Sequence, residues 1–146
     1  MKILAALGVV FLALVFIRAA VNKTTVKDEG KGIQFFQGTW DEALELAKKE
    51  DKLIFLDAYA SWCGPCKRMA SQTFVSTEAG NFYNENFINV KMDMEKGEGP
   101  TIAQKYNVRS YPSLFFINGS GSVQYQAEGF RDPSSLVNLG KEAITQ

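Results

Sequence analysis

The sequence LIFLDAYASWCGPCK, residues 53–67, contains an apolar run followed by the only two cysteines of this 146-residue chain. Residues 53–60 have the length and apolar character of a buried β-strand. Pro65 suits the first turn of a helix, because an N–H at that position would have no partner. The segment therefore predicts a strand, a turn and a helix N-terminus, with Cys63 presented at the carboxyl end of the strand. In open α/β sheets, ligands bind at that end.

The two thiols of such a segment would lie in different environments. Cys63 would face the unpaired N–H groups and the positive dipole end of the helix, which favours its thiolate. Cys66 would lie one turn further in and be better shielded. We therefore predict that Cys63 is the nucleophile and Cys66 the resolving thiol of a dithiol–disulfide exchange, which proceeds through a mixed disulfide.

Three other interpretations of the cysteine pair remain open but are weaker. A zinc site needs two further ligands, and the chain has no histidine and no other cysteine, so no metal is expected. A purely structural disulfide across so short a loop would add little stability. The third alternative is a pair of inert buried thiols that lie by chance beside a strand–helix junction.

The composition is that of a globular protein, with 46% hydrophobic and 12% aromatic residues. The 16 basic and 16 acidic residues cancel, which gives no sign of a nucleic-acid partner. We expect residues 33–146 to form one domain and the protein to be a monomer.

The N-terminus differs from the remainder of the chain. Lys2 precedes an uncharged apolar run, residues 3–17, which is followed by Arg18. This pattern is typical of a signal peptide, and the run is short for a membrane span of about 20 residues. The small-x-small cleavage pattern is absent, however, so an uncleaved anchor is the alternative. We predict a signal peptide or N-terminal anchor at 1–21 and a polar linker at 22–32. Either export segment predicts localisation in the periplasm or cell envelope.

The rest of the chain predicts a mixed β-sheet with helices on both faces, an α/β fold. The helix after residue 39 begins with a capping box of Thr39 and Glu42, and the residue before the last helix is Asp132. The predicted strands are 33–36, 53–59, 87–93, 113–117 and 123–128. The five predicted helices end near residues 49, 74, 86, 106 and 144. Thr77 is the predicted cap of the third helix, and the fourth is predicted to begin at about residue 101.

Asp57 lies in the middle of the apolar strand, where an ionised carboxylate is costly to bury. Burial raises the pKa of a carboxyl group, which suits a proton acceptor near neutral pH. Our hypothesis is that Asp57 helps to deprotonate Cys66; the alternative is a strand-end aspartate that faces solvent. Lys91, on a neighbouring predicted strand, is a possible charge partner of Asp57, although most lysines are simply solvated.

Two further features precede and follow the last predicted hairpin. Tyr111-Pro112 is a plausible site for a cis peptide bond, although on the residues alone a trans proline at the start of a strand is the commoner case. Gly129 ends the hairpin, and a glycine there permits close approach of a ligand chain.

Residues 55–67, 111–116 and 129–130 together resemble the thioredoxin superfamily, and the resemblance extends over about 33–144. Residues 73–74 and 129–132 are most similar to the branch that includes the periplasmic C-terminal domain of the membrane thiol:disulfide interchange protein and related secreted proteins. The resemblance implies a thioredoxin fold, in which a central mixed sheet is flanked by helices on both faces. It also implies that the redox-active disulfide is the only cofactor.

The resemblance assigns catalytic roles to Cys63, Cys66 and Asp57, makes Lys91 the neighbour of Asp57, and makes Pro112 a cis-proline that faces the disulfide. It also implies a substrate-binding edge at which the partner chain pairs in β-fashion. Trp62 would shield the sulfurs there, and the other residues of this edge are Gly64, Pro65, Tyr111 and Gly129.

The predicted activity is that of a thiol–disulfide oxidoreductase that reduces exported proteins, since Gly64-Pro65 resembles reducing members of the superfamily. Oxidase and isomerase activity are the alternatives within this class. The expected partners are disulfide-containing exported proteins and an upstream thiol electron donor, for which a membrane-embedded protein is one option. A redox-inactive binding or holdase module is the alternative from another class. Tyr59, Ser61 and Tyr111 depart from the cytosolic pattern, so cytosolic substrate preferences are not carried over.

Overall fold

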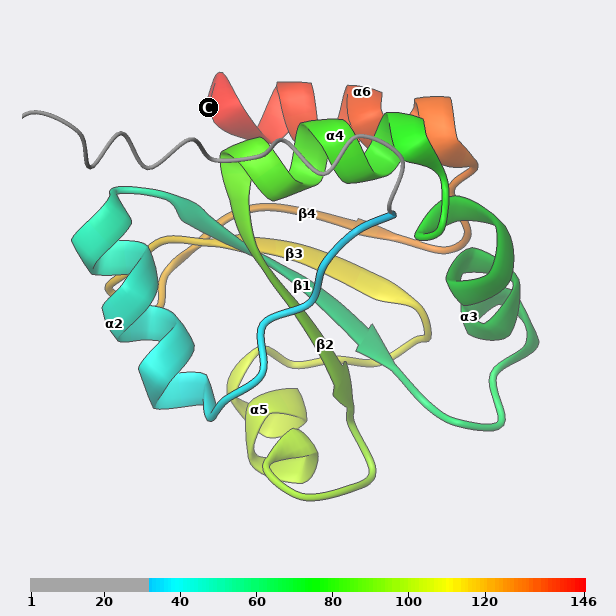
Figure 1. Ribbon diagram of the computed structural model, residues 1–146. Helices are drawn as coiled ribbons and strands as arrows, with labels where there is room; N and C mark the ends of the chain where they lie inside the picture. Colours follow the sequence, from blue (N-terminus) through cyan, green and yellow to red (C-terminus); the bar gives the residue numbers. More distant parts are fainter. Residues whose placement is uncertain (1–31) are drawn as a thin grey trace, which may run out of the picture.

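Four strands form one sheet in the computed structural model, which describes residues 32–146 (Figure 1). The strand order is β2-β1-β3-β4, with β1 parallel to β2 and antiparallel to β3, and β3 antiparallel to β4. The sheet is therefore mixed, as predicted. The bounds agree with the predicted ones for β1 (Leu53–Tyr59), β2 (Phe87–Asp93), β3 (Ser113–Ile117) and β4 (Val123–Glu128).

The strand predicted at residues 33–36 is wrong, because this segment is extended but forms no ladder. Phe36 N–H donates to the Asn89 carbonyl of β2 over 2.7 Å, whereas Ile33 N–H donates to the Phe74 carbonyl over 2.6 Å. The segment thus divides its hydrogen bonds between the sheet and the chain after the cysteine helix. Within the described residues, β2 is an edge strand of the sheet with this segment beside it.

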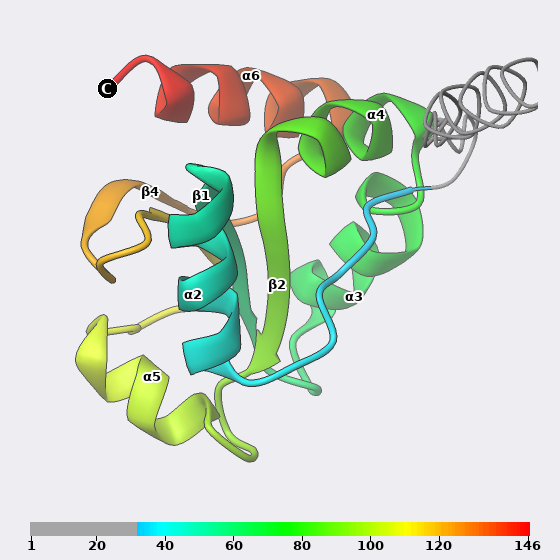
Figure 2. The same ribbon diagram turned by 60° about the vertical axis from the view of Figure 1, so that its left-hand side comes forward.

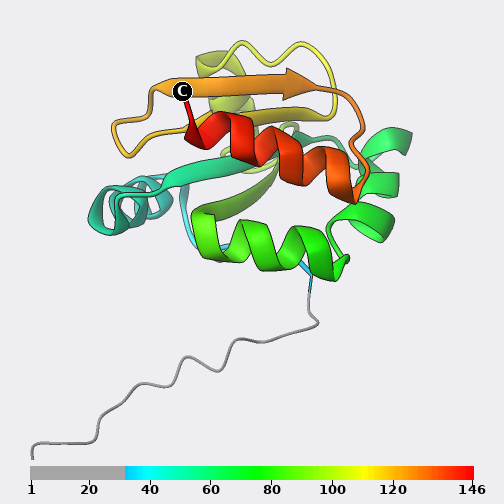
Figure 3. The ribbon, with the colours of Figure 1, turned by 90° about the horizontal axis from the view of Figure 1, so that it is seen from above.

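Helices cover both faces of the sheet, as predicted (Figures 2 and 3). Side chains of β1 alternate between two cores: Phe55 packs with residues of α4 and α6, whereas Leu56 packs with residues of α2 and α5. The helices of the first face are α4 (Thr77–Asn86) and α6 (Pro133–Ile144), and those of the second are α2 (Trp40–Glu50) and α5 (Gly99–Lys105).

The starts of two helices agree with the sequence-based expectation, and the starts of two others differ from it. Thr39 and Glu42 form the predicted capping box of α2, and Asp132 caps α6. The cap of α4 is Ser76 rather than Thr77, because its hydroxyl accepts the Ala79 N–H. The helix predicted to begin at residue 101 begins two residues earlier, which puts its proline in the first turn.

The helix that contains the cysteines is interrupted. The predicted single helix to about residue 74 is instead α3 (Gly64–Arg68) followed by the π-helical segment η1 (Met69–Thr73). Phe74 N–H donates to the Met69 carbonyl, which is the π-helical spacing. The Thr73 hydroxyl is buried and donates to the Arg131 carbonyl over 2.6 Å, and this bond fixes the segment against the loop before α6.

The predicted signal peptide or anchor at 1–21 lies outside the described residues, as does the predicted linker apart from Gly32. Among residues 32–146, no helix has both the length and the apolar character that a bilayer span requires.

Candidate active site

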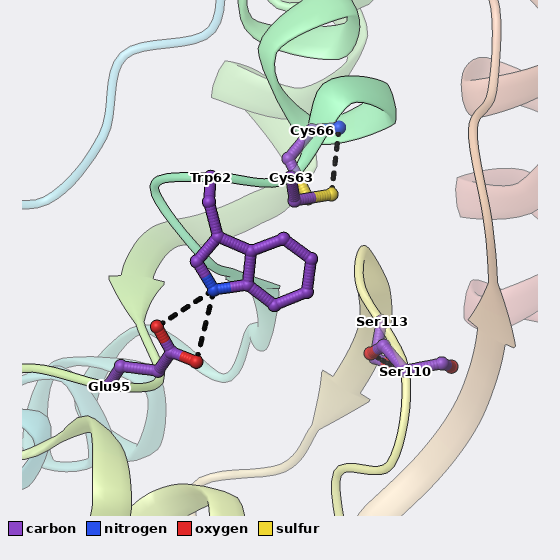
Figure 4. The surroundings of a disulfide bond; sticks show 6 residues. All are labelled: Trp62, Cys63, Cys66, Glu95, Ser110 and Ser113. Atoms are coloured by element: carbon purple, nitrogen blue, oxygen red, sulfur yellow. Dashed lines mark hydrogen bonds between the residues drawn. A yellow bond between two sulfur atoms is a disulfide. The ribbon is translucent and has the colours of Figure 1, made fainter.

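Cys63 and Cys66 are joined in a disulfide at the start of α3, with their Cα atoms 5.3 Å apart (Figure 4). Cys63 is the N-cap residue of α3, and its Sγ accepts the Cys66 N–H over 3.2 Å. The predicted order of strand, turn and helix N-terminus is therefore confirmed. In this oxidised form both cysteines are buried, with exposed fractions of 3% and 4%, so the better shielding predicted for Cys66 is not seen.

Trp62 lies next to the disulfide and, at 65%, is the most exposed large apolar side chain in the part of the chain that the structure describes. Its indole N–H donates to both carboxylate oxygens of Glu95, over 2.9 and 3.1 Å (Figure 4). The indole ring also meets the Tyr111 ring edge to face, with centroids 5.8 Å apart. Tyr111 in turn packs against the cluster of Ala60, Cys63 and Cys66, so the indole and the phenol lie together beside the disulfide.

The loop before β3 provides the other side of this surface. The Tyr111–Pro112 peptide bond is cis, and Pro112 is buried. The Pro112 carbonyl accepts the Gly129 N–H over 2.9 Å, and the Ser113 hydroxyl donates to the Ser110 carbonyl over 2.8 Å. Both bonds hold the loop against the sheet. Within the described residues, the backbone N–H and C=O of Tyr111 have no hydrogen-bond partner.

Asp57 lies in β1 with an exposed fraction of 1%, so the alternative of a solvent-facing aspartate is wrong. It shares the face of Phe55 and Tyr59, the face covered by α4 and α6. Its Oδ1 atom has no hydrogen-bond partner among residues 32–146. Burial raises the pKa of Asp57 to about 7, and the charge of Lys91 acts in the opposite direction. A carboxyl group with this pKa can accept a proton near neutral pH.

Lys91 is the residue of β2 in register with Asp57. No ion pair joins the two side chains, both of which the structure describes. The Lys91 ammonium lies instead among aromatic rings, with Nζ 4.8 Å from the Tyr59 centroid and 5.3 Å from the Phe74 centroid. The structure thus makes Lys91 the predicted neighbour of Asp57 but not its salt-bridge partner.

Sequence comparison identifies the family. The model of the thioredoxin family matches residues 33–142. The chain belongs to the thioredoxin family. The predicted superfamily and the predicted thioredoxin fold are thereby confirmed.

Curated relatives of this thioredoxin-family chain include Thioredoxin of Echinococcus granulosus, 42% identical over 79 residues, which are 53% of this chain and 68% of that protein. Thioredoxin-T of Drosophila melanogaster is 37% identical over 84 residues, 58% of this chain and 49% of that protein. The matches span about half to two thirds of the length of these relatives.

Two solved structures are also similar. The solution structure of a candidate disulphide-isomerase from Bacteroides thetaiotaomicron is 43% identical and has a TM-score of 0.69; the match covers 79% of this chain and 95% of that chain. The oxidised C-terminal domain of DsbD from Neisseria meningitidis is 26% identical with a TM-score of 0.61, over 75% of this chain and 99% of that domain.

The two glycines assigned to the substrate-binding edge differ in what their positions require. Gly129 has a φ of +84°, and a Cβ there would come no closer than 3.8 Å to another side chain, so its backbone conformation rather than lack of space favours glycine. A Cβ at Gly64 would meet nothing within 4 Å, so the surface there is open. Pro65, in the first turn of α3, is also exposed.

Three polar residues of this thioredoxin-family site were not predicted from the sequence. Glu95 follows β2 and reaches Trp62 across 33 residues of chain, which no local pattern reveals. Ser110 and Ser113 flank the Tyr111-Pro112 dipeptide, and the Ser110 Oγ is buried without a hydrogen-bond partner (Figure 4). Hydroxyl groups on both sides of a Tyr-Pro pair are the only signal that the sequence offered.

Proposed function

We propose that this thioredoxin-family protein is a thiol–disulfide oxidoreductase that reduces disulfides in exported proteins. The observation that carries the proposal is the Cys63–Cys66 disulfide at the start of α3. A disulfide that closes so small a ring adds little to stability, which leaves redox exchange as its use. The buried carboxyl group of Asp57, in the strand that leads to Cys63, supplies a proton acceptor.

The reaction begins with the reduced protein. The Cys63 thiolate attacks one sulfur of the substrate disulfide, so that a bond forms between Cys63 and that sulfur while the substrate S–S bond breaks. The second substrate sulfur leaves as a thiolate and takes up a proton. The N-terminal position of Cys63 on α3 favours its thiolate, because its Sγ accepts a backbone N–H there.

The second step releases the product. The Cys66 thiol gives its proton to the Asp57 carboxylate, and the Cys66 thiolate attacks the Cys63 sulfur of the mixed disulfide. The bond between Cys63 and the substrate breaks as the Cys63–Cys66 bond forms, and the departing substrate thiolate takes a proton. One substrate disulfide becomes two thiols, and the protein dithiol becomes the disulfide seen here.

The substrate docks beside Tyr111. Its backbone N–H and C=O, which bond to nothing in residues 32–146, are available for β-type pairing with an extended segment of the partner. The exposed Trp62 ring and the open surface at Gly64 border the same position. Support for docking here is the packing of Tyr111 against the cluster of Ala60, Cys63 and Cys66.

The reductive direction requires a thiol donor that returns the disulfide to the dithiol. We propose an upstream dithiol protein, with a membrane-embedded protein as one option. Gly64-Pro65 between the cysteines supports the reductive direction, since it resembles reducing members of the family. A reduction potential near about −270 mV would support a reductase, whereas one near about −120 mV would indicate an oxidant.

The proposed location is the periplasm or cell envelope. The uncharged apolar run after Lys2 supports export, and the similarity to the DsbD C-terminal domain is consistent with it. Fusing the first 32 residues to a reporter that is active only after export tests this location. A reporter that stays inactive would contradict it.

A Cys66→Ala variant tests the mechanism. It should accumulate mixed disulfides through Cys63 with proteins of the native host, because the second step is removed. The double variant Cys63→Ala, Cys66→Ala is the matched control and should capture none. If Cys66→Ala captured no partner through Cys63, the exchange mechanism would be wrong. Full cellular function of the double variant would favour the redox-inactive binding module instead.

A further inference from the structure

Three aromatic rings surround the ammonium group of Lys91. Its Nζ lies 4.8 Å from the Tyr59 ring centroid, 5.3 Å from that of Phe74 and 6.0 Å from that of Phe35. At these distances each ring face attracts a cation. We call Phe35, Tyr59 and Phe74 the aromatic cage. Its members come from the segment before α2, from β1 and from the end of η1.

The cage is anchored on both sides. Phe35 and Phe74 meet edge to face with centroids 5.3 Å apart, and the Ile33 N–H donates to the Phe74 carbonyl. Tyr59 packs against the cluster that contains Cys63 and Cys66. Through Tyr59, the cage therefore borders the cluster of Ala60, Cys63 and Cys66, and the irregular segment at 33–36 forms one wall of the cage.

The position of the ammonium relative to Asp57 is the unusual feature. Lys91 and Asp57 are in register on adjacent parallel strands and share one face of the sheet. Both side chains are described, yet no ion pair joins them. The Asp57 Oδ1 is buried, and the described part of the chain offers it no hydrogen-bond partner. A direct ion pair would occupy the carboxylate oxygens and make Asp57 a weak base. A cation held at a distance stabilises the carboxylate and leaves an oxygen free.

We propose that the aromatic cage positions the Lys91 ammonium near Asp57 without contact, so that Asp57 keeps a free oxygen for the Cys66 proton. Phe35, Tyr59 and Phe74 are then positioning residues that act through Lys91. The step at Cys66 rests on the proposed exchange reaction, whereas the electrostatic coupling between the cage and Asp57 does not.

The other groups around Asp57 are few. Among residues 32–146, the titratable groups that interact electrostatically with it are Lys91 from β2 and Tyr59 from β1. β3 brings Leu114 into register with Asp57, and the cysteines of α3 are joined in the disulfide and do not titrate. In the oxidised protein, the titration of Asp57 therefore reports on the position of the Lys91 charge.

The experiment measures the pKa of Asp57 in the oxidised protein by carboxyl ¹³C NMR. Lys91→Met should raise it, because the stabilising charge is lost. Tyr59→Leu should raise it as well, because an uncaged ammonium moves into solvent. Tyr59→Phe is the matched control: it keeps an aromatic face and should leave the pKa of Asp57 as in the parent protein. Phe35→Leu, at a partly buried position, repeats the test if Tyr59→Leu folds poorly.

A double-mutant cycle separates positioning from packing. In the Lys91→Met background, Tyr59→Leu should raise the pKa of Asp57 no further, because there is no ammonium left to hold. An equal rise in both backgrounds, or no rise in the parent background, would overturn the proposal. The titration needs no substrate, so its result does not depend on the exchange reaction. If the cage altered the pKa of Asp57 but the protein had no exchange activity, the proposed function would be wrong and the proposed role of the cage would stand.

Discussion

The indole N–H of Trp62 donates to both carboxylate oxygens of Glu95, over 2.9 and 3.1 Å (Figure 4). This contact joins the turn before α3 to the loop after β2. Trp62 is 65% exposed, and this bond adds to the edge-to-face contact with Tyr111 in limiting rotation of the indole ring. The Glu95 carboxylate therefore orders the Trp62 indole, the large exposed apolar group beside the disulfide, before a partner binds. Ordering before binding lowers the entropy lost when a partner docks.

Replacing Glu95 by alanine should release the Trp62 side chain. In a Trp40→Phe background, which leaves Trp62 as the only tryptophan, time-resolved fluorescence anisotropy should show faster local motion. The KM for a protein disulfide should rise roughly two- to tenfold, the effect of one side chain that must be ordered on binding. Glu45→Ala, at an exposed position of α2, is the control. Unchanged anisotropy in the Glu95 variant would contradict the prediction.

Burial of Asp57 should make the oxidised protein less stable as the pH rises. In the unfolded chain its proton leaves near pH 3.8, whereas in the folded protein burial raises the pKa to about 7. Between these values the folded state binds one more proton than the unfolded state, so the free energy of unfolding falls with rising pH. The loss is complete above pH 7 and amounts to on the order of 4 kcal/mol.

Asp57→Asn should remove this dependence, because the amide does not titrate. Urea unfolding of the oxidised protein should therefore show that the variant is the more stable of the two at pH 8, with a smaller advantage or none at pH 4. Asp41→Asn, at an exposed position in the first turn of α2, is the matched control and should leave the slope with pH unchanged. If the free energy of unfolding changed with pH in the same way in Asp57→Asn and in the parent protein, the raised pKa of the buried Asp57 would be contradicted.

The sequence predicted the four strands of the sheet because each is a short apolar or alternating run bounded by turn residues. Because residues 55–67 form one contiguous motif, the sequence also predicted that Trp62, Cys63 and Cys66 lie together. It did not predict Glu95, Ser110 or Ser113. The same apolar run predicted that the carboxyl group of Asp57 is buried, with a solvent-facing position at the strand end as the alternative.

Some of the failures involve contacts between distant parts of the chain, whereas the helix starts and the π-helical turn are local differences. Residues 33–36 have a strand-like composition, yet their hydrogen bonds go partly to Phe74 and to the side chain of Asn84, 50 residues away from Gln34. Apolar spacing predicted a continuous helix after Cys66, because a π-helical turn adds only one residue to the spacing. The cation held by aromatic rings needs three segments that only the folded chain brings together.

Gly129→Ala should destabilise the protein through its backbone. Its φ of +84° is unfavourable for residues with a Cβ, and the nearest atom to the new methyl group would be 3.8 Å away, so no steric clash is added. The expected loss is about 1 kcal/mol in the free energy of unfolding. Gly64→Ala is the matched control, because its Cβ would meet nothing within 4 Å and its φ is not positive. Equal losses for both variants in urea unfolding would contradict this explanation.

Asp57→Asn should slow release of the product from the mixed disulfide more than formation of that disulfide. The first step needs only the Cys63 thiolate, whereas the second needs the proton of Cys66 to be removed. Loss of a general base typically slows such a step by about 100-fold. In the parent protein the carboxylate form of Asp57 exists above its raised pKa of about 7, so the release rate should increase with pH and level off above that value.

The measurement uses stopped flow with a chromogenic mixed disulfide formed on Cys63, in which release of the chromophore reports attack by Cys66. The pH dependence near 7 should disappear in Asp57→Asn, and Asp41→Asn should behave as the parent protein does. If Asp57→Asn slowed both steps equally, the carboxylate would act on the whole site rather than on Cys66. If it slowed neither step, Asp57 would have no part in proton transfer.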